Sequence, residues 1–237
     1  MVAHAMKLLA IDTSTEACSA ALWLDGEVCE RFELTGREHT QKLMPQVASL
    51  MAECGVSYQQ LDGIVCGHGP GSFAGVRIGV GYVKGLGLAL DRPVLGVSSL
   101  AMLALRAARE NGATQVLSAI DARMNEVYFG AFEVIEGKLR ELAAEVVVSP
   151  AAIPAVSAGR WLAVGTGWGA YREALSTAAA VELIQVLPEA LPHAGDALLL
   201  AAPEFAAGRA INADVLAPVY LRNKVALTIV EQAALRK

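Results

Sequence analysis

The sequence has few cysteines and histidines, and neither type is spaced as in a metal site. Its 237 residues contain four of each. The cysteines are Cys18, Cys29, Cys54 and Cys66. They form no CxxC pair and stand in apolar or strand-like segments, so we expect buried, reduced thiols rather than disulfides or a zinc site. The histidines are His4, His39, His68 and His193. They show neither HxxxH nor HExxH spacing, and we therefore expect no metal site.

Uninterrupted hydrophobic runs of bilayer length are also missing. Arg77 and Lys84 interrupt the most apolar segment before it reaches the eighteen or so residues that a membrane span needs. The segment 1–6 has neither a basic region nor a long apolar stretch, so it does not resemble a secretory signal. The sequence therefore predicts a cytoplasmic protein without membrane association.

The chain has fewer positively than negatively charged residues. The formal net charge is −5, and no stripe rich in lysine or arginine compensates for it. Neutralisation of phosphates is the main sequence-independent source of affinity for nucleic acids, so the chain is not expected to hold a nucleic acid unaided. A hydrophobic content of 54% is enough for a sizeable core, in one large domain or two smaller ones.

The first half of the chain alternates between strand and helix patterns. An Asp25-Gly26 turn between two alternating runs predicts a hairpin. Apolar residues at helical spacing predict a helix at 40–53, and Pro93 ends a second helix that begins near Ser72. The strands are expected at 7–11, 17–24, 27–34, 63–66 and 94–97. This order predicts an α/β fold with a mixed sheet flanked by helices.

The opening pattern returns in the second half. Ala119-Ile120-Asp121 repeats Ala10-Ile11-Asp12 and precedes a strand at 126–132, which indicates a weak internal duplication. We expect two domains, 1–112 and 113–237. An alanine-rich helix is predicted at 195–207, broken at Pro203.

A glycine-rich turn at 67–75 follows an apolar strand and opens a helix. Backbone N–H groups at such a helix start can bind an anion, with Ser72 as the N-cap. The alternative is that Gly67, Gly69 and Gly71 only permit a tight turn and close strand-to-helix packing. Asp12, Thr13 and Ser14 also allow two interpretations. They resemble the phosphate-side loop of actin-like ATPases, but short polar side chains equally cap ordinary turns.

Three segments together carry a resemblance to a known family. They are Leu8-Leu9-Ala10-Ile11-Asp12-Thr13-Ser14-Thr15, His39-Thr40-Gln41-Lys42-Leu43-Met44-Pro45 and the glycine-rich segment 67–79. The chain resembles the TsaB (YeaZ) family, a partner subunit in bacterial tRNA threonylcarbamoyladenosine synthesis. Weaker echoes are Ile120-Asp121-Ala122-Arg123, Gly165-Thr166-Gly167 and Pro218-Val219-Tyr220-Leu221-Arg222. Ala74 and Val76 depart from the usual threonine and leucine. The resemblance implies a duplicated actin-like (ribonuclease-H-like) fold.

The resemblance also implies a function. The chain is expected to be a non-catalytic scaffold for forming the threonylcarbamoyl group on N6 of the adenosine beside the anticodon, in tRNAs that read codons starting with adenine. TsaD and TsaE would be its partners, tRNA would bind through the complex, and a free chain would form a homodimer. No intrinsic cofactor is expected, which leaves ATP or ADP as ligands of the complex.

The alternative is an independent actin-like ATPase or an M22-type metallopeptidase. In TsaD, two histidines of an HxxxH motif ligate the catalytic metal, and Ser99 and Leu103 stand at the matching positions here. The large C-terminal nucleotide segment of TsaD has no counterpart in this sequence. Both differences favour the scaffold.

The helices at 40–53 and 72–90 are the expected partner surface. Glycines inside a helix each cost about 0.5–1 kcal/mol relative to alanine, which close packing against another backbone would offset. That packing is either intramolecular or, as the resemblance implies, against the equivalent helices of TsaD. The proposed contact residues are Leu43, Val47, Leu50, Met51, Gly75, Gly79 and Gly85.

Overall fold

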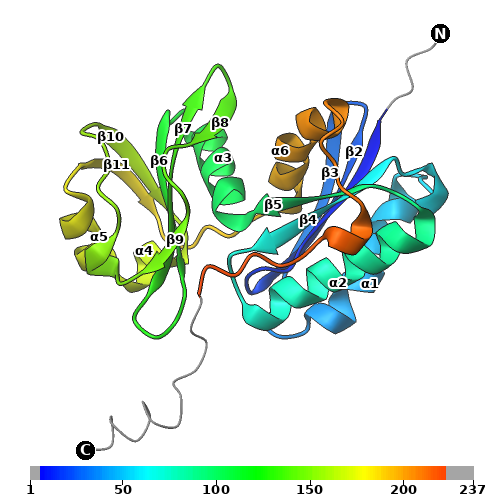
Figure 1. Ribbon diagram of the computed structural model, residues 1–237, viewed down its shortest axis with the longest axis horizontal. Helices are drawn as coiled ribbons and strands as arrows, with labels where there is room; N and C mark the ends of the chain where they lie inside the picture. Colours follow the sequence, from blue (N-terminus) through cyan, green and yellow to red (C-terminus); the bar gives the residue numbers. More distant parts are fainter. Residues whose placement is uncertain (1–5, 223–237) are drawn as a thin grey trace, which may run out of the picture.

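The computed structural model describes residues 6–222, which form two halves that are each built around a β-sheet (Figure 1). The first sheet has the strand order β3-β2-β1-β4-β5. Its strands are β1 (Lys7–Asp12), β2 (Ala17–Leu24), β3 (Glu27–Leu34), β4 (Gly63–Gly69) and β5 (Val94–Ser98). The predicted hairpin at Asp25-Gly26 joins β2 to β3, and the predicted strands are confirmed, with β4 three residues longer than expected.

Helices cover both faces of this sheet. Alternate residues of β1 point to opposite faces: Leu9 and Ile11 lie in one apolar cluster, and Leu8 and Ala10 in another. The first cluster is closed by α1 (His39–Glu53) and α2 (Phe73–Leu90), and the second by α6 (Ala194–Ala206). Figure 1 shows the α1/α2 pair and α6 on either side of the sheet.

The second sheet has the order β11-β10-β6-β7-β8, with β9 paired to β7. Its strands are β6 (Gln115–Asp121), β7 (Val127–Ile135), β8 (Lys138–Glu141), β9 (Val146–Val148), β10 (Arg160–Val164) and β11 (Glu182–Leu187). One face packs on α3 (Ser99–Asn111), the other on α4 (Thr166–Ala170) and α5 (Arg172–Ala179). Three 3-10 turns complete the order: η1 (Tyr58–Gln60), η2 (Pro150–Ala152) and η3 (Ala213–Val215).

The two sheets have the same topology. In each, three strands form an antiparallel meander, the first of them pairs in parallel with a fourth strand, and the fourth pairs in parallel with a fifth. The duplication predicted from Ala10-Ile11-Asp12 and Ala119-Ile120-Asp121 is therefore present, and both triplets lie at the ends of equivalent strands. This is the duplicated α/β fold that the sequence predicts.

The strands of the first sheet end at Ser98 and those of the second begin at Gln115, whereas the helices are not divided in this way. α6 returns to the first sheet, and Ala213 and Leu216 around η3 pack in the cluster under α2. The predicted break of the alanine-rich helix is wrong, because α6 continues through Pro203 to Ala206. Two segments with sequence-based expectations lie outside the described residues. They are residues 1–5, where no secretory signal is expected, and residues 223–237, the end of the second expected domain.

One helix of the described chain, α2, is long and apolar enough to cross a membrane by length and composition. A third of that window is buried inside the molecule, and core helices of soluble proteins pass the same test. Val76, Val80 and Val83 of α2 pack into the core of the first half.

Candidate functional site

The loop after β1 holds Asp12, Thr13 and Ser14, all fully buried. The backbone N–H and the hydroxyl of Ser14 both donate to Asp12 Oδ1, at 3.3 and 3.0 Å. Thr13 donates its hydroxyl to the carbonyl oxygen of Gly75 in α2, at 2.7 Å. The loop is therefore fixed to the start of α2 instead of opening to solvent.

Burial has a strong effect on Asp12. Its Oδ2 atom has no hydrogen-bond partner among the described residues. Desolvation raises the pKa of the Asp12 carboxyl to about 7, and the two hydrogen bonds from Ser14 lower it only in part. A carboxyl group in this setting takes up a proton near neutral pH, which an exposed aspartate does not.

The glycine-rich turn packs directly on this loop. The Ser72 N–H donates to the Ser14 carbonyl oxygen at 2.7 Å, and the Ser72 hydroxyl caps α2 by accepting from the Gly75 N–H. The predicted N-cap is confirmed. A Cβ atom at Gly71 would overlap the Ser14 carbonyl oxygen, and one at Gly75 would overlap that of Thr13. These two glycines are needed for close backbone contact, so intramolecular packing explains them.

A cleft of about 610 Å³ lies between the two halves, next to this loop. One wall comes from the first half, through Ser14–Glu16, Arg37 and the start of α2 at 71–73. The opposite wall comes from the end of β6 at 120–124, together with Tyr128 and Thr166. The carboxyl ends of equivalent strands in the two halves thus face one another across the cleft.

The far wall contains an unusual turn. Arg123, Met124 and Asn125 all have positive φ, between 57° and 61°. Asp121 stabilises the turn, since its carboxylate accepts from the Arg123 N–H at 2.8 Å and from the Arg123 guanidinium at 2.9 Å. Three successive non-glycine residues in the left-handed region carry a conformational cost, and such turns are frequent at functional sites.

The last described residues run along the cleft and contact both halves. The Val219 N–H donates to the His68 carbonyl oxygen at 2.9 Å. Arg222 donates to the Ala122 carbonyl oxygen at 3.0 Å and forms an ion pair with Glu126. Figure 1 shows this segment crossing from η3, beside α2, towards β9. We call residues 216–222 the C-terminal strap.

The strap also builds an aromatic and cationic cluster at the cleft mouth. The Arg77 guanidinium lies 3.2 Å from the centre of the Phe73 ring and 5.0 Å from that of Tyr220. Phe73 and Tyr220 are both exposed over more than half of their surface. The stack joins α2 to the strap by cation–π attraction while leaving apolar surface in solvent.

The structure corrects the expected partner surface. Leu43, Val47, Leu50 and Met51 are buried in the core under α1, where they contact β1, β2 and β4. Gly75 and Gly79 face Thr13 inside the molecule. Gly85 alone of the seven proposed residues is open, since nothing lies within 4 Å of the position its Cβ would take.

The two positions at which the resemblance implies histidines in TsaD are buried in this chain. Ser99 and Leu103 lie buried in α3. Within residues 6–222, no group of three or more His, Cys, Asp and Glu side chains is placed to hold a metal ion. His39 is buried, and its Nε2 lies 2.8 Å from the Thr15 carbonyl oxygen and 3.2 Å from that of Ala17, so it anchors the loop between β1 and β2.

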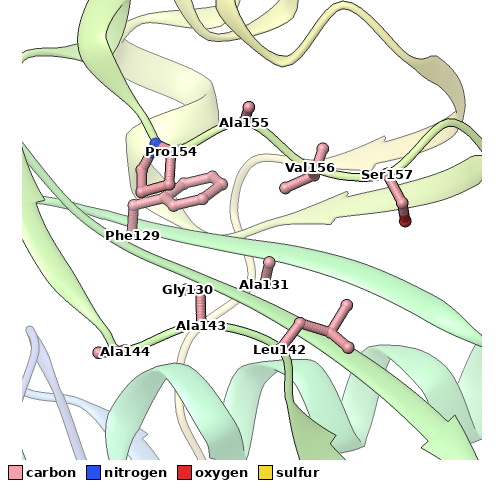
Figure 2. A pocket seen from close by; sticks show the side chains of 10 residues that line it. All are labelled: Phe129, Gly130, Ala131, Leu142, Ala143, Ala144, Pro154, Ala155, Val156 and Ser157. Carbon is pink, nitrogen blue, oxygen red and sulfur yellow. The ribbon is translucent and has the colours of Figure 1, made fainter.

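A second cavity, of about 260 Å³, lies in the other half (Figure 2). Its walls are Phe129 to Ala131 of β7 and the segments 142–144 and 154–157. The lining is apolar apart from Ser157 and backbone groups. With no acid, base or nucleophile beyond that one hydroxyl, this cavity offers little for catalysis.

Comparison with known proteins shows the family of the chain. The family model described as "TsaD: tRNA N6-adenosine threonylcarbamoyltransferase" matches residues 33–229. The chain is 44% identical over 225 residues to the tRNA threonylcarbamoyladenosine biosynthesis protein TsaB of Escherichia coli, covering 93% of this chain and 96% of that protein. The chain belongs to the TsaB family.

Other members agree with this assignment. TsaB of Haemophilus influenzae is 40% identical, covering 93% of this chain and 95% of that protein. YeaZ from Pseudomonas aeruginosa superposes with a TM-score of 0.85 at 46% identity, covering 91% of this chain and the whole of that one. The resemblance found in the N-terminal motifs is therefore confirmed along nearly the full TsaB-family chain, and with it the actin-like fold.

Two parts of the site are not evident from the sequence. The left-handed turn at 123–125 contains no glycine that would indicate it. The strap lines the cleft through Arg222, which is a hundred positions after its partner Ala122 in the sequence. The only signal of either is the pair of family echoes at Ile120-Asp121-Ala122-Arg123 and Tyr220-Leu221-Arg222. Neither echo indicates that Arg222 hydrogen-bonds to Ala122.

Proposed function

We propose that this chain is a non-catalytic scaffold and activator in the synthesis of tRNA threonylcarbamoyladenosine, the product named for its relatives in E. coli and H. influenzae. The observation that carries the proposal is the packing at the start of α2. An anion seat at a helix N-terminus needs free backbone N–H groups. Here the Ser72 N–H donates to the Ser14 carbonyl oxygen and the Gly75 N–H to the Ser72 hydroxyl, so two of the N–H groups around this helix start already have acceptors within the chain.

The reaction assigned to the complex is transfer of a threonylcarbamoyl group from its adenylate to N6 of the adenosine beside the anticodon. In this proposal TsaD carries out the transfer and TsaE is a further partner, all in the cytoplasm. The net charge of −5 supports an arrangement in which the partners, rather than this chain alone, hold the tRNA. ATP or ADP would then be a ligand of the assembled complex, and this chain would need no cofactor of its own.

The proposed docking surface for TsaD is the exposed stripe of α2. Phe73 and Leu88 are each 58% exposed, and the nearby α1 adds Met44, which is 62% exposed. Between them Gly81 and Gly85 leave the helix backbone bare, with open space where their Cβ atoms would stand. A partner helix can approach such a surface closely. In the absence of TsaD, a second copy of the chain would occupy the same stripe as a homodimer.

Replacement of Gly85 by leucine tests this surface. The open space at Gly85 and the higher helix propensity of leucine should preserve the fold. The added side chain would separate the two backbones, and overpacking of this kind typically costs a few kcal/mol, or about a hundredfold in affinity. Titration calorimetry with TsaD measures the change.

The matched control is Thr177→Leu, at an exposed position of α5 in the other half. It should bind TsaD with wild-type affinity. Gly79→Leu is a poor probe, because its Cβ would lie 2.6 Å from the Thr13 hydroxyl inside the molecule. If folded Gly85→Leu binds as tightly as the control, the α2 stripe is not the interface.

A further inference from the structure

Edge strand β3 presents a row of three side chains to α1. Residues directly opposite each other in an antiparallel pair share a face of the sheet. Cys29, Arg31 and Glu33 of β3 lie opposite Leu22, Ala20 and Cys18 of β2. Those three β2 residues are in the core beneath α1 and α2. The row on β3 therefore points to the same side as the helices.

Each member of the row meets a residue of α1 or of its C-cap. Glu33 forms an ion pair with Lys42 at 2.7 Å, near the start of the helix. Arg31 forms an ion pair with Glu53, in its last turn. Cys54, the C-cap, is next to Glu53, and burial together with the neighbouring Cys29 thiol raises the pKa of its thiol to about 11. The strand and the helix thus run past each other with the two cysteines at one end of the contact.

These two cysteines differ from the other two. Cys18 and Cys66 are buried, and burial raises the pKa of the Cys18 thiol to about 12. Cys29 is exposed, against the expectation of four buried thiols, and Cys54 is half-buried beside it. Reactivity of cysteine towards oxidants requires solvent access and thiolate formation, so attack should begin at Cys29.

We propose that Cys29 and Cys54 form a reversible disulfide, a redox modification site that ties the edge strand β3 to the C-terminal end of α1. In this site Cys29 is the exposed attacking thiol and Cys54 is the resolving thiol. The oxidant is a low-molecular-weight disulfide such as oxidised glutathione. Paired thiols of this kind in reducing compartments are typically redox-sensing rather than structural.

The reaction takes two exchange steps. The Cys29 thiolate attacks one sulfur of oxidised glutathione, whose S–S bond breaks and releases one glutathione thiolate. The thiol of Cys54 then loses its proton and attacks the Cys29 sulfur of the mixed disulfide, which releases the second glutathione. Two protein thiols are oxidised and one small disulfide is reduced to two thiols, so atoms and electrons balance.

The test uses the full-length reduced protein, incubated with oxidised glutathione and then treated with an alkylating agent. The mass before alkylation should fall by two hydrogen atoms, with no glutathione retained. When the oxidised and the reduced protein are both unfolded before alkylation, the oxidised protein should carry two alkyl groups fewer. Cleavage after Glu27, Glu30 and Glu53 should release a cross-linked pair of peptides that separates on reduction. Dithiothreitol should restore both thiols.

Single variants assign the cross-link. Cys29→Ser and Cys54→Ser should each abolish it, and each should leave a glutathione adduct on the remaining cysteine of the pair, more readily on Cys29. Cys18→Ala is the matched control and should cross-link like the wild type. Stable adducts on both cysteines without a cross-link would overturn the proposal, as would a cross-link that survives in either single variant. These readouts do not depend on TsaD or tRNA, so they stand apart from the proposed function.

Discussion

Asp12 lies buried at the end of β1, in a strongly perturbed environment behind the cleft wall that begins at Ser14. Its carboxyl group is fully buried, one oxygen has no partner among the described residues, and desolvation raises its pKa to about 7. The unfolded chain has the ordinary value near 4. Between pH 4 and pH 7 the Asp12 carboxyl group keeps its proton in the folded state and has lost it in the unfolded state. The free energy of unfolding therefore decreases as the pH rises from about 4 to 7.

Asp12→Asn should therefore stabilise the protein at pH 8. The amide keeps an acceptor for Ser14 and has no charge to bury. A pKa shift of this size corresponds to at most about 4 kcal/mol, present above pH 7 and absent below pH 4. Urea unfolding at pH 8 and pH 5 measures the gain, which should be smaller at pH 5.

The exposed carboxylate of Glu189 provides the control for this series, and Glu189→Gln should have little effect on stability because the side chain lies in solvent. A gain from Asp12→Asn that is the same at pH 5 and pH 8, or no gain at all, would contradict the assignment of a proton to Asp12.

For single residues, the sequence shows the residue type and predicts its place in an element, but not its burial. Asp12, Thr13 and Ser14 are identifiable as a polar loop after a strand, but their burial depends on Gly71 and Gly75, about sixty positions later. The strand-like segment around Cys29 predicts a buried thiol, whereas Cys29 is exposed. Only the strand order shows that β3 is an edge strand, where side chains reach solvent.

At the scale of elements, the helices were predictable and their outer faces were not. α1 begins one residue before its predicted start, and α2 begins after its predicted cap. An apolar stripe at helical spacing indicates a buried face without indicating what buries it. Leu43, Val47, Leu50 and Met51 of α1 face the chain's own sheet, so the partner surface proposed above uses the exposed stripe of α2 instead.

The contact between α3 and α6 is a second feature of elements, and it lies beyond any local pattern. Asp196 in the first turn of α6 is 1% exposed and pairs with Arg109 at 2.6 Å and Arg106 at 3.4 Å. Burial raises the pKa of Asp196 despite the arginines. The pairing joins residues almost ninety positions apart and fixes the returning helix against α3.

The two sides of this cluster should respond differently to mutation. Arg106→Gln with Arg109→Gln leaves a buried carboxylate without a cation, and should cost about 3 kcal/mol at pH 8. Asp196→Asn should cost about 1 kcal/mol, because the arginines, 32% and 54% exposed, can be solvated. Urea unfolding of both variants tests the order, and a larger loss from Asp196→Asn would contradict it.

At the scale of the whole molecule, the triplets Ala10-Ile11-Asp12 and Ala119-Ile120-Asp121 predict the duplicated architecture. The contacts that join the two halves around the cleft are not predictable from the sequence. The halves are joined by α6, by the strap, and by a hydrogen bond from the Ser98 hydroxyl to Glu145. Each connects segments remote in sequence. The result is a cleft between the two halves of an actin-like fold, in which a backbone hydrogen bond from Ser72 to Ser14 holds the loop after β1.

The central claim is that this chain contributes a surface to the complex and not a reacting group. The most direct test measures the rate of threonylcarbamoyladenosine synthesis in a reaction reconstituted with TsaD and TsaE. In this reaction the Asp12→Asn variant replaces the wild-type chain at a saturating concentration. The account predicts a rate within a few-fold of wild type. A loss of more than about a hundredfold, or roughly 2.7 kcal/mol, with TsaD binding intact, would mean that Asp12 takes part in the chemistry and that the claim is wrong.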